Sequence, residues 1–230
     1  MPTMWWLMPM DPNLKLQPNP DGREGNWSNS FAKLLQFLAN ATCLDIAYAV
    51  NRLAAYTVNL SLQHATALKR ILRYLKGTND YGITYQKSPQ WTLNYFYRFA
   101  DTAYANTDDL KSTSGYVFIS VGGVITWRSK KQTTIALSST KAEYVALSKA
   151  GHKACWLRSL YKELGQEQLE PTLIKGDKDG SIAMAQNPQF HKQSKHMDTH
   201  WHWVWDQVDQ KNLEIESCWD SSGCPNKGFT

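Results

Sequence analysis

The pattern of apolar residues divides the chain into a helical first part and a second part in which strands and helices alternate. From Ser30 to Lys76 the apolar spacing is helical, and a new helix begins near Ser61. One buried stripe of this second helix consists of Ala65, Leu68, Leu72 and Leu75. Gly77-Thr-Asn-Asp80 predicts its end, and proline, glycine and asparagine make residues 11–28 an irregular lead-in.

After Asp80 the pattern predicts strands, with a short one at Tyr81–Tyr85. Apolar and polar residues then alternate from Trp91 to Phe99, and Asp101 continues the parity of the apolar positions. The remaining predicted elements are a hairpin at 116–127 that turns at Gly122-Gly123, a long helix at 140–164, a strand at 171–177, helices at 181–186 and 198–206, and a strand at 213–218. This order predicts an α/β fold, a mixed sheet flanked by helices and preceded by a small helical segment.

Composition narrows the class of protein. No apolar run approaches the roughly 18 residues that a membrane helix needs, which excludes an integral membrane protein. Four scattered cysteines are not a disulfide framework and favour an intracellular location. The net charge of +5 fits a surface that binds polyanions. Basic residues crowd the second helix, where they form either a solvated face or a surface that follows phosphates: Lys69, Arg70, Arg73 and Lys76.

Three carboxylates occupy positions typical of an active site. Asp101 ends a buried strand face, Glu143 lies in the first turn of the long helix, and Asp177 ends the next strand. Strand ends and adjacent helix starts meet at one edge of an α/β sheet. Three acids gathered there would repel one another unless cations lay between them, and Mg²⁺ prefers such oxygen ligands. Two Mg²⁺ ions roughly 4 Å apart hydrolyse phosphodiesters.

Each acid also has a purely structural interpretation. Thr140-Lys-Ala-Glu143 reads as a capping box, which the spacing alone favours. Asp101 also fits a turn at the end of a strand, and Asp177 a turn or a helix cap. A zinc site is a competing interpretation, and its candidate ligands are His191, His196, His200, His202, Cys218 and Cys224. The wide spacing of the two cysteines argues against zinc.

Several strings of residues resemble the C-terminal part of the Pol polyprotein of copia-type retrotransposons, where the end of the reverse transcriptase precedes an RNase H domain. They are His64-Ala-Thr-Ala-Leu-Lys-Arg-Ile-Leu-Arg-Tyr-Leu-Lys-Gly-Thr78, Lys111-Ser-Thr-Ser-Gly-Tyr116, Trp127-Arg-Ser-Lys-Lys-Gln132, Ala136-Leu-Ser-Ser-Thr-Lys-Ala-Glu-Tyr-Val-Ala-Leu147 and Lys195-His-Met-Asp198. The resemblance extends from about Met10 to Glu216.

The resemblance implies an RNase H-like domain at 81–230 with an incomplete C-terminal end, preceded at 1–80 by a helical remnant of the connection region of the reverse transcriptase. It implies an enzyme, a ribonuclease that cuts RNA in RNA–DNA hybrids with two Mg²⁺ ions held by Asp101, Glu143 and Asp177. We expect Lys130 and Lys131, with the basic helix, to bind the hybrid. The polymerase part of the same polyprotein would be a partner, and the location would be the cytoplasm, a virus-like particle or the nucleus.

The fourth acid of the family departs from its pattern. The family has a Gln-x-Ala-Asp string after the last strand, whereas here Asn226 lies near the expected place. Asp198 and Asp220 are the nearby substitutes, and neither matches the pattern. Two rival hypotheses follow. The chain is either a catalytically decayed remnant that keeps the fold, or a non-catalytic nucleic-acid binder that uses the basic helix.

Overall fold

The computed structural model describes residues 8–11, 14–19, 29–57, 59–86, 97–177, 179–186 and 199–217. The chain divides into two compact units. Unit 1 comprises Met1–Ile83 and Arg128–Lys131, and unit 2 comprises Thr84–Trp127 and Gln132–Thr230. Among the described residues, no helix is both long and apolar enough to span a lipid bilayer.

Unit 1 is helical, as the apolar spacing predicts. Its elements are α1 (Asn29–Ala41), the short 3₁₀-helix η2 (Leu44–Ile46), α2 (Ala47–Ala54) and α3 (Leu62–Gly77). Apolar side chains from all of these elements are buried, including Leu35, Ile46, Leu53 and Ile71. Burial of this apolar area stabilises the packing of α1 and α3 against α2.

The start of α3 explains why the helix begins at this point of the chain. Ser61 is its N-cap residue, and the Ser61 backbone N–H donates to Nδ1 of His64 at 2.9 Å. His64 is fully buried and its ring lies 4.5 Å from the ring of Tyr56. The capping interaction therefore supplies the buried imidazole with a hydrogen bond while it satisfies an N–H group that the helix leaves unpaired.

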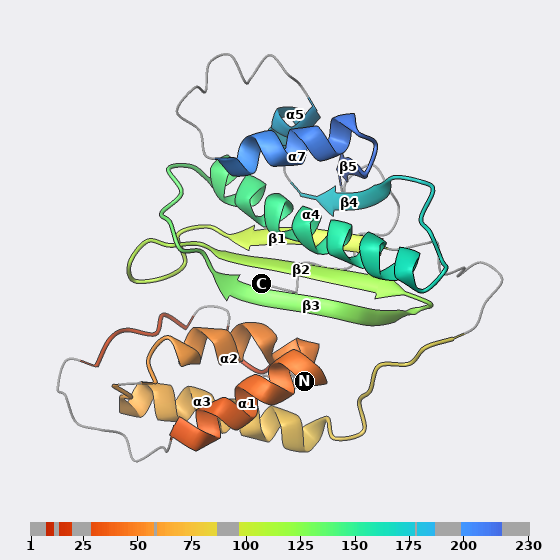
Figure 1. Ribbon diagram of the computed structural model, residues 1–230. Coiled ribbons are helices and arrows are strands. Elements are labelled where there is room, and N and C mark those ends of the chain that lie inside the picture. Colours follow the sequence, from red (N-terminus) through yellow and green to blue (C-terminus); the bar gives the residue numbers. More distant parts are fainter. Residues whose placement is uncertain are drawn as a thin grey trace, which may run out of the picture. The chain divides into compact units, whose positions relative to one another are not determined.

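A five-stranded sheet with the strand order β3-β2-β1-β4-β5 belongs to unit 2, except for Arg128–Lys131 at the end of one strand. Its strands are β1 (Tyr97–Ala103), β2 (Thr113–Ser120), β3 (Gly123–Lys131), β4 (Thr172–Gly176) and β5 (Leu213–Ser217). β1 pairs antiparallel with β2, and β4 pairs parallel with both β1 and β5. Figure 1 shows β2 and β3 running in opposite directions, as expected for the hairpin that turns at Gly122-Gly123.

The helices of unit 2 are α4 (Ser139–Glu163), α5 (Asp179–Gln186) and α7 (Thr199–Asp209). Figure 1 shows α4 running along one face of the sheet. Its apolar stripe packs with Phe118, Ile174 and Ile215 from three strands to form the core. At Gly151 a Cβ atom would lie 3.0 Å from the side chains of Leu213 and Trp203, so a glycine allows this close approach. The mixed sheet flanked by helices that the sequence predicts is confirmed.

Two segments between the helices of unit 1 and the hairpin differ from the local expectation. The predicted strand at Tyr81–Tyr85 is wrong, because residues 81–86 join no ladder of the sheet. Gln86 N donates one hydrogen bond to Val121 O, and a single bond does not make a strand. The alternation from Trp91 continues past Phe99, since β1 extends to Ala103, and residues 91–96 lie outside the described part of the chain.

Candidate active site

The two aspartates come from neighbouring parallel strands. Asp101 lies within β1, and Asp177 directly follows β4. Phe99 pairs with Lys175 across these strands, so Asp101 and Asp177, each two residues further along, stand level with each other. Because β1 continues through Ala103, the interpretation of Asp101 as a turn residue is wrong.

Glu143 comes from the first turns of α4, and the cap of this helix differs from the one predicted. Ser138 is the N-cap residue, and its side chain accepts a hydrogen bond from Lys141 N at 3.2 Å. Thr140 already lies inside the helix. The predicted capping box Thr140–Glu143 is therefore wrong. With Ser138 as the N-cap, the third helical position is Lys141, whereas a capping box has an acid or a glutamine there. Glu143 lies two residues beyond that position.

The structure brings the three acids together although Glu143 lies 42 residues after Asp101 and Asp177 lies 34 residues after Glu143. Each offers one carboxylate oxygen, and these oxygens all lie within 4.8 Å of one another. Glu143 is buried, with 3% of its surface exposed, whereas Asp101 and Asp177 are half-buried. The Thr102 backbone N–H donates to Oδ1 of Asp101 at 2.7 Å, which fixes that carboxylate.

This set of donors fits a hard divalent cation. Carboxylate oxygens are the ligands that Mg²⁺ and Mn²⁺ prefer, and a cation between them offsets their mutual repulsion. Partial burial strengthens the attraction, because the effective dielectric constant there is lower than in water. The arrangement can therefore concentrate cationic charge at one edge of the sheet, beside the exposed sides of two carboxylates.

One buried amide near these acids was not singled out from the sequence. Gln132 directly follows β3 and is 2% exposed, and it hydrogen-bonds to residues adjacent to Asp101 and Glu143. No periodicity or motif marks a lone glutamine after a basic strand as important. Its place in the string Trp127-Arg-Ser-Lys-Lys-Gln132, which carries part of the resemblance, is the signal that could have found it.

The basic residues of α3 divide into two groups. Lys69, Arg73 and Lys76 are exposed at positions i, i+4 and i+7, which places them on one face of the helix. Arg70 instead donates from Nε to Met8 O at 3.1 Å and lies 3.9 Å from the Asp11 carboxylate. On β3, Lys130 is exposed and Lys131 is half-buried.

Several candidate zinc ligands and candidates for a fourth acid lie outside the described residues. Of the proposed zinc ligands, His191, His196, Cys218 and Cys224 lie outside the described residues, as does the side chain of His200. The three candidates for a fourth acid lie outside them as well: Asp198, Asp220 and Asn226.

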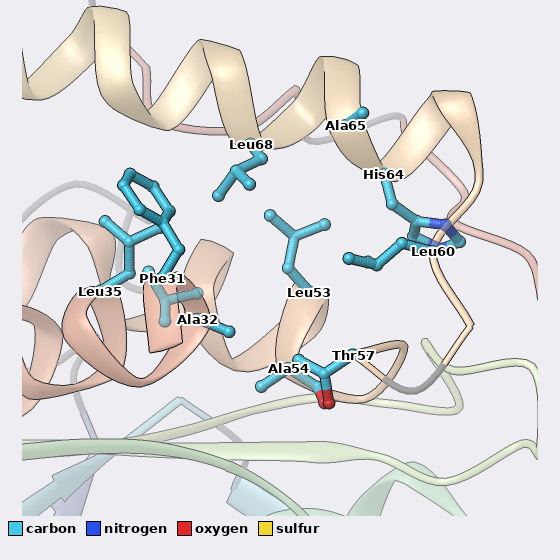
Figure 2. A pocket seen from close by; sticks show the side chains of 11 residues that line it. Phe31, Ala32, Leu35, Leu53, Ala54, Thr57, Leu60, His64, Ala65 and Leu68 are labelled. Atoms are coloured by element: carbon cyan, nitrogen blue, oxygen red, sulfur yellow. The ribbon is translucent and has the colours of Figure 1, made fainter. Parts of the chain in front are cut away.

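A small apolar pocket lies between the helices of unit 1. Its lining residues are Phe31, Ala32, Leu35, Val50, Leu53, Ala54, Thr57, Leu60, His64, Ala65 and Leu68. Figure 2 shows His64 and Leu68 of α3 opposite Leu53 of α2. The cavity measures about 30 Å³, room for roughly one water molecule, and its lining contains no carboxylate. It is an apolar gap in the packing of the helices, and His64 is the titratable side chain in its lining.

Comparison with known proteins gives clear relatives. The chain is 34% identical over 205 residues to the retrovirus-related Pol polyprotein from transposon TNT 1-94 of Nicotiana tabacum, a match that covers 87% of this chain and 15% of that protein. It is 40% identical over 181 residues to the corresponding polyprotein from transposon RE2 of Arabidopsis thaliana, covering 79% and 12%. The chain thus spans less than a sixth of these polyproteins. No protein-family model matches the sequence.

A shorter relative is the secreted RxLR effector protein 161 of Plasmopara viticola. It is 43% identical over 123 residues, which cover 54% of this chain and 85% of that protein. Among solved structures, LC11-RNase H1 isolated from compost aligns with a TM-score of 0.38 and 13% identity, over 54% of this chain and 84% of that one. The sheet of this chain has an antiparallel β3-β2-β1 half and a parallel β1-β4-β5 half.

Proposed function

This chain is homologous to a segment of the retrovirus-related Pol polyproteins of plant transposons, and on that premise we propose that unit 2 is an RNase H-type nuclease domain. It would hydrolyse the RNA strand of RNA–DNA hybrids, with two Mg²⁺ ions held by Asp101, Glu143 and Asp177. Unit 1 would be the end of the preceding reverse transcriptase, of copia type. An intracellular location stays a prediction.

The observation that carries this proposal is the convergence of three acids from three separate elements of an RNase H-like fold. Helix capping no longer accounts for Glu143, because Ser138 caps α4. A buried carboxylate beside two others costs folding free energy unless a cation offsets it. A ligand role explains why the chain tolerates that cost.

Each of the three acids would have a role that follows from its burial and its hydrogen bonds. Glu143, which is buried, would supply a charge that water screens little, and Asp101 would present a carboxylate fixed by the Thr102 N–H group. Asp177 would complete the set from the end of β4. When bound, the two metal ions would stabilise charge on the phosphodiester oxygens and lower the pKa of an attacking water. The products would be 3′-hydroxyl and 5′-phosphate ends.

The exposed cations of α3 support the substrate class. Lys69, Arg73 and Lys76 on one helix face, and Lys130 on β3, match a phosphate backbone in charge. Arg70 contributes less, because it is engaged with Met8 and Asp11. Contacts to the phosphate backbone of a duplex position it without depending on its base sequence. A nuclease that acts on hybrids of any sequence requires contacts of this kind.

The test is hydrolysis of a labelled RNA strand in an RNA–DNA hybrid with Mg²⁺, beside all-RNA and all-DNA duplexes. We expect cleavage of the hybrid alone, abolished by EDTA. Asp101→Asn keeps the Oδ1 acceptor and removes the charge, so its rate should fall by about a hundred- to a thousand-fold. Asp108→Asn, an exposed aspartate of the β1–β2 loop, is the matched control and should cut normally. Equal cleavage by Asp101→Asn and the unmodified chain would refute the assignment.

The rival hypothesis is a decayed domain, and one sequence feature favours it. Where the family carries its fourth acid, Asn226 offers a neutral amide. A decayed chain would bind the hybrid without cutting it, and Asn226→Asp would leave that result unchanged. In an active chain, Asn226→Asp should raise the rate at a fixed Mg²⁺ concentration.

A further inference from the structure

The amide side chain of Gln132 joins three elements of unit 2. Its Nε2 atom donates to Ser114 Oγ on β2 at 2.7 Å and to Ala142 O on α4 at 2.9 Å. Thr102 Oγ1 on β1 lies 3.5 Å from the same atom. The Gln132 backbone N–H donates to Ser112 O at 2.7 Å, which anchors the residue at the end of β3.

Two of these partners, Thr102 and Ala142, are the chain neighbours of two of the three acids. Thr102 follows Asp101, and its backbone N–H holds the Asp101 carboxylate. Ala142 precedes Glu143, and its carbonyl accepts from both Gln132 and Thr102 Oγ1, the latter at 3.3 Å. A single buried amide therefore connects the backbone that carries Asp101 to the backbone that carries Glu143.

A role in general core packing explains this arrangement poorly. Gln132 is 2% exposed, and among the described residues its Oε1 atom has no hydrogen-bond partner. Burying an amide with an unsatisfied oxygen costs free energy that an apolar side chain of similar size would avoid. The two hydrogens on Nε2, by contrast, are both used in short hydrogen bonds to Ser114 Oγ and Ala142 O, which fixes the start of α4 relative to β2. The Thr102 hydroxyl on β1 donates to the same Ala142 carbonyl and links it to β1.

We propose that Gln132 is a positioning residue that sets the separation of the Asp101 and Glu143 carboxylates for the metal ions. This inference rests on the proposed metal site. Gln132 ligates nothing itself, and it acts through Thr102 and Ala142. Residues that orient metal ligands in this way typically change metal affinity by 10- to 100-fold when they are replaced.

The experiment is calorimetric titration of the full chain with Mn²⁺, with Mg²⁺ in parallel. Gln132→Met keeps the volume of the side chain and removes its hydrogen bonds, and we expect its Mn²⁺ dissociation constant to rise by about tenfold or more. Hybrid cleavage by this variant should recover as the metal concentration is raised, since the acids themselves remain. A purely structural role would lower stability without shifting the metal dependence.

Gln168→Met is the matched control. Gln168 is also a buried glutamine, 7% exposed, but it follows the far end of α4, and roughly 30 Å of helix separate Glu143 from that end. We expect this variant to bind Mn²⁺ like the unmodified chain. An unchanged dissociation constant in Gln132→Met, or an equal rise in Gln168→Met, would overturn the inference.

Two milder variants keep the test decisive if Gln132→Met does not fold. Ser114→Ala removes the acceptor at 2.7 Å, and Thr102→Val removes the hydroxyl between Gln132 and Ala142. Weaker Mn²⁺ binding in both supports the inference, and unchanged binding in both refutes it. An unmodified chain that binds no Mn²⁺ refutes the metal site and the inference together, whereas binding that Gln132→Met retains in full refutes the inference alone.

Discussion

At the scale of single residues, the three carboxylates are a source of repulsion within the fold. One oxygen of each carboxylate lies within 4.8 Å of the others, and Glu143 is buried. Like charges at such distances destabilise the folded state, and most strongly where water is excluded. Without bound cations, a folded protein with such a site is then less stable than one with neutral side chains at the same positions.

This repulsion yields a prediction for Asp101→Asn without metal. The asparagine keeps the oxygen that accepts from Thr102 N and removes one charge, so the metal-free variant should be more stable by about 1 kcal/mol. For a chain of this length that raises the melting temperature by roughly 2–4 °C at pH 7. Mg²⁺ should raise the melting temperature of the unmodified chain and not that of the variant. A lower metal-free melting temperature for the variant would show that the acids do not repel one another appreciably.

At the scale of elements, the start of α4 decides where Glu143 lies. Ser138 caps the helix in an extended conformation, and Lys141 N is its hydrogen-bond partner. Because the cap fixes the first turn, it also fixes the position of the side chains that follow within the next turn.

We therefore expect Ser138→Ala to lower the free energy of unfolding by about 1 kcal/mol, and Ser138→Thr to lose less because it retains the hydroxyl. Thr140→Ala is the control, and it should stay within roughly 0.5 kcal/mol of the unmodified chain because Thr140 is not the cap. Urea unfolding measures all three. A larger loss for Thr140→Ala than for Ser138→Ala would restore Thr140 as the capping residue.

At the scale of the whole molecule, the excess of basic residues becomes a binding surface only where the cations are exposed together. Lys69 and Arg73 meet this condition on α3, since both are exposed and lie one turn apart. Arg70, on the same helix, is half-buried beside Asp11.

The double variant Lys69→Glu/Arg73→Glu should bind RNA–DNA hybrids more weakly. Its plot of log affinity against log salt concentration should be flatter by about two units, because two phosphate contacts are lost. Lys15→Glu/Lys33→Glu changes the net charge equally, at exposed positions of the same unit, and should keep the original slope. Filter binding between 50 and 200 mM salt, a range over which such contacts change affinity by orders of magnitude, measures both. Equal slopes in the two double variants would mean that net charge alone drives binding.

Most elements of the fold and their order can be predicted from the amino-acid sequence alone. The glycine turn between β2 and β3 and the strands near Asp101 and Asp177 follow from local patterns, because periodicity in burial is a property of neighbouring residues. On α3 the local pattern is right for Ala65 and Leu68, but the structure buries Ile71 and Tyr74 and leaves Leu72 and Leu75 half-buried. The acids became candidates through their places at strand ends and through the resemblance to copia-type polyproteins. Their convergence within 4.8 Å required the register of β1 and β4 and the placement of α4.

The pairing of distant polar groups, by contrast, depends on how the elements pack in three dimensions. Ser138 and not Thr140 caps α4, residues 81–85 form no strand, and Gln132 joins Ser114, Ala142 and Thr102, which lie 18, 10 and 30 residues away in the chain. A hydrogen bond depends on distances of about 3 Å and on angles, and no local pattern encodes these between distant residues. The chain order therefore predicted the scaffold and its acids, while the hydrogen bonds that set their spacing arose from the packing of strands against a helix.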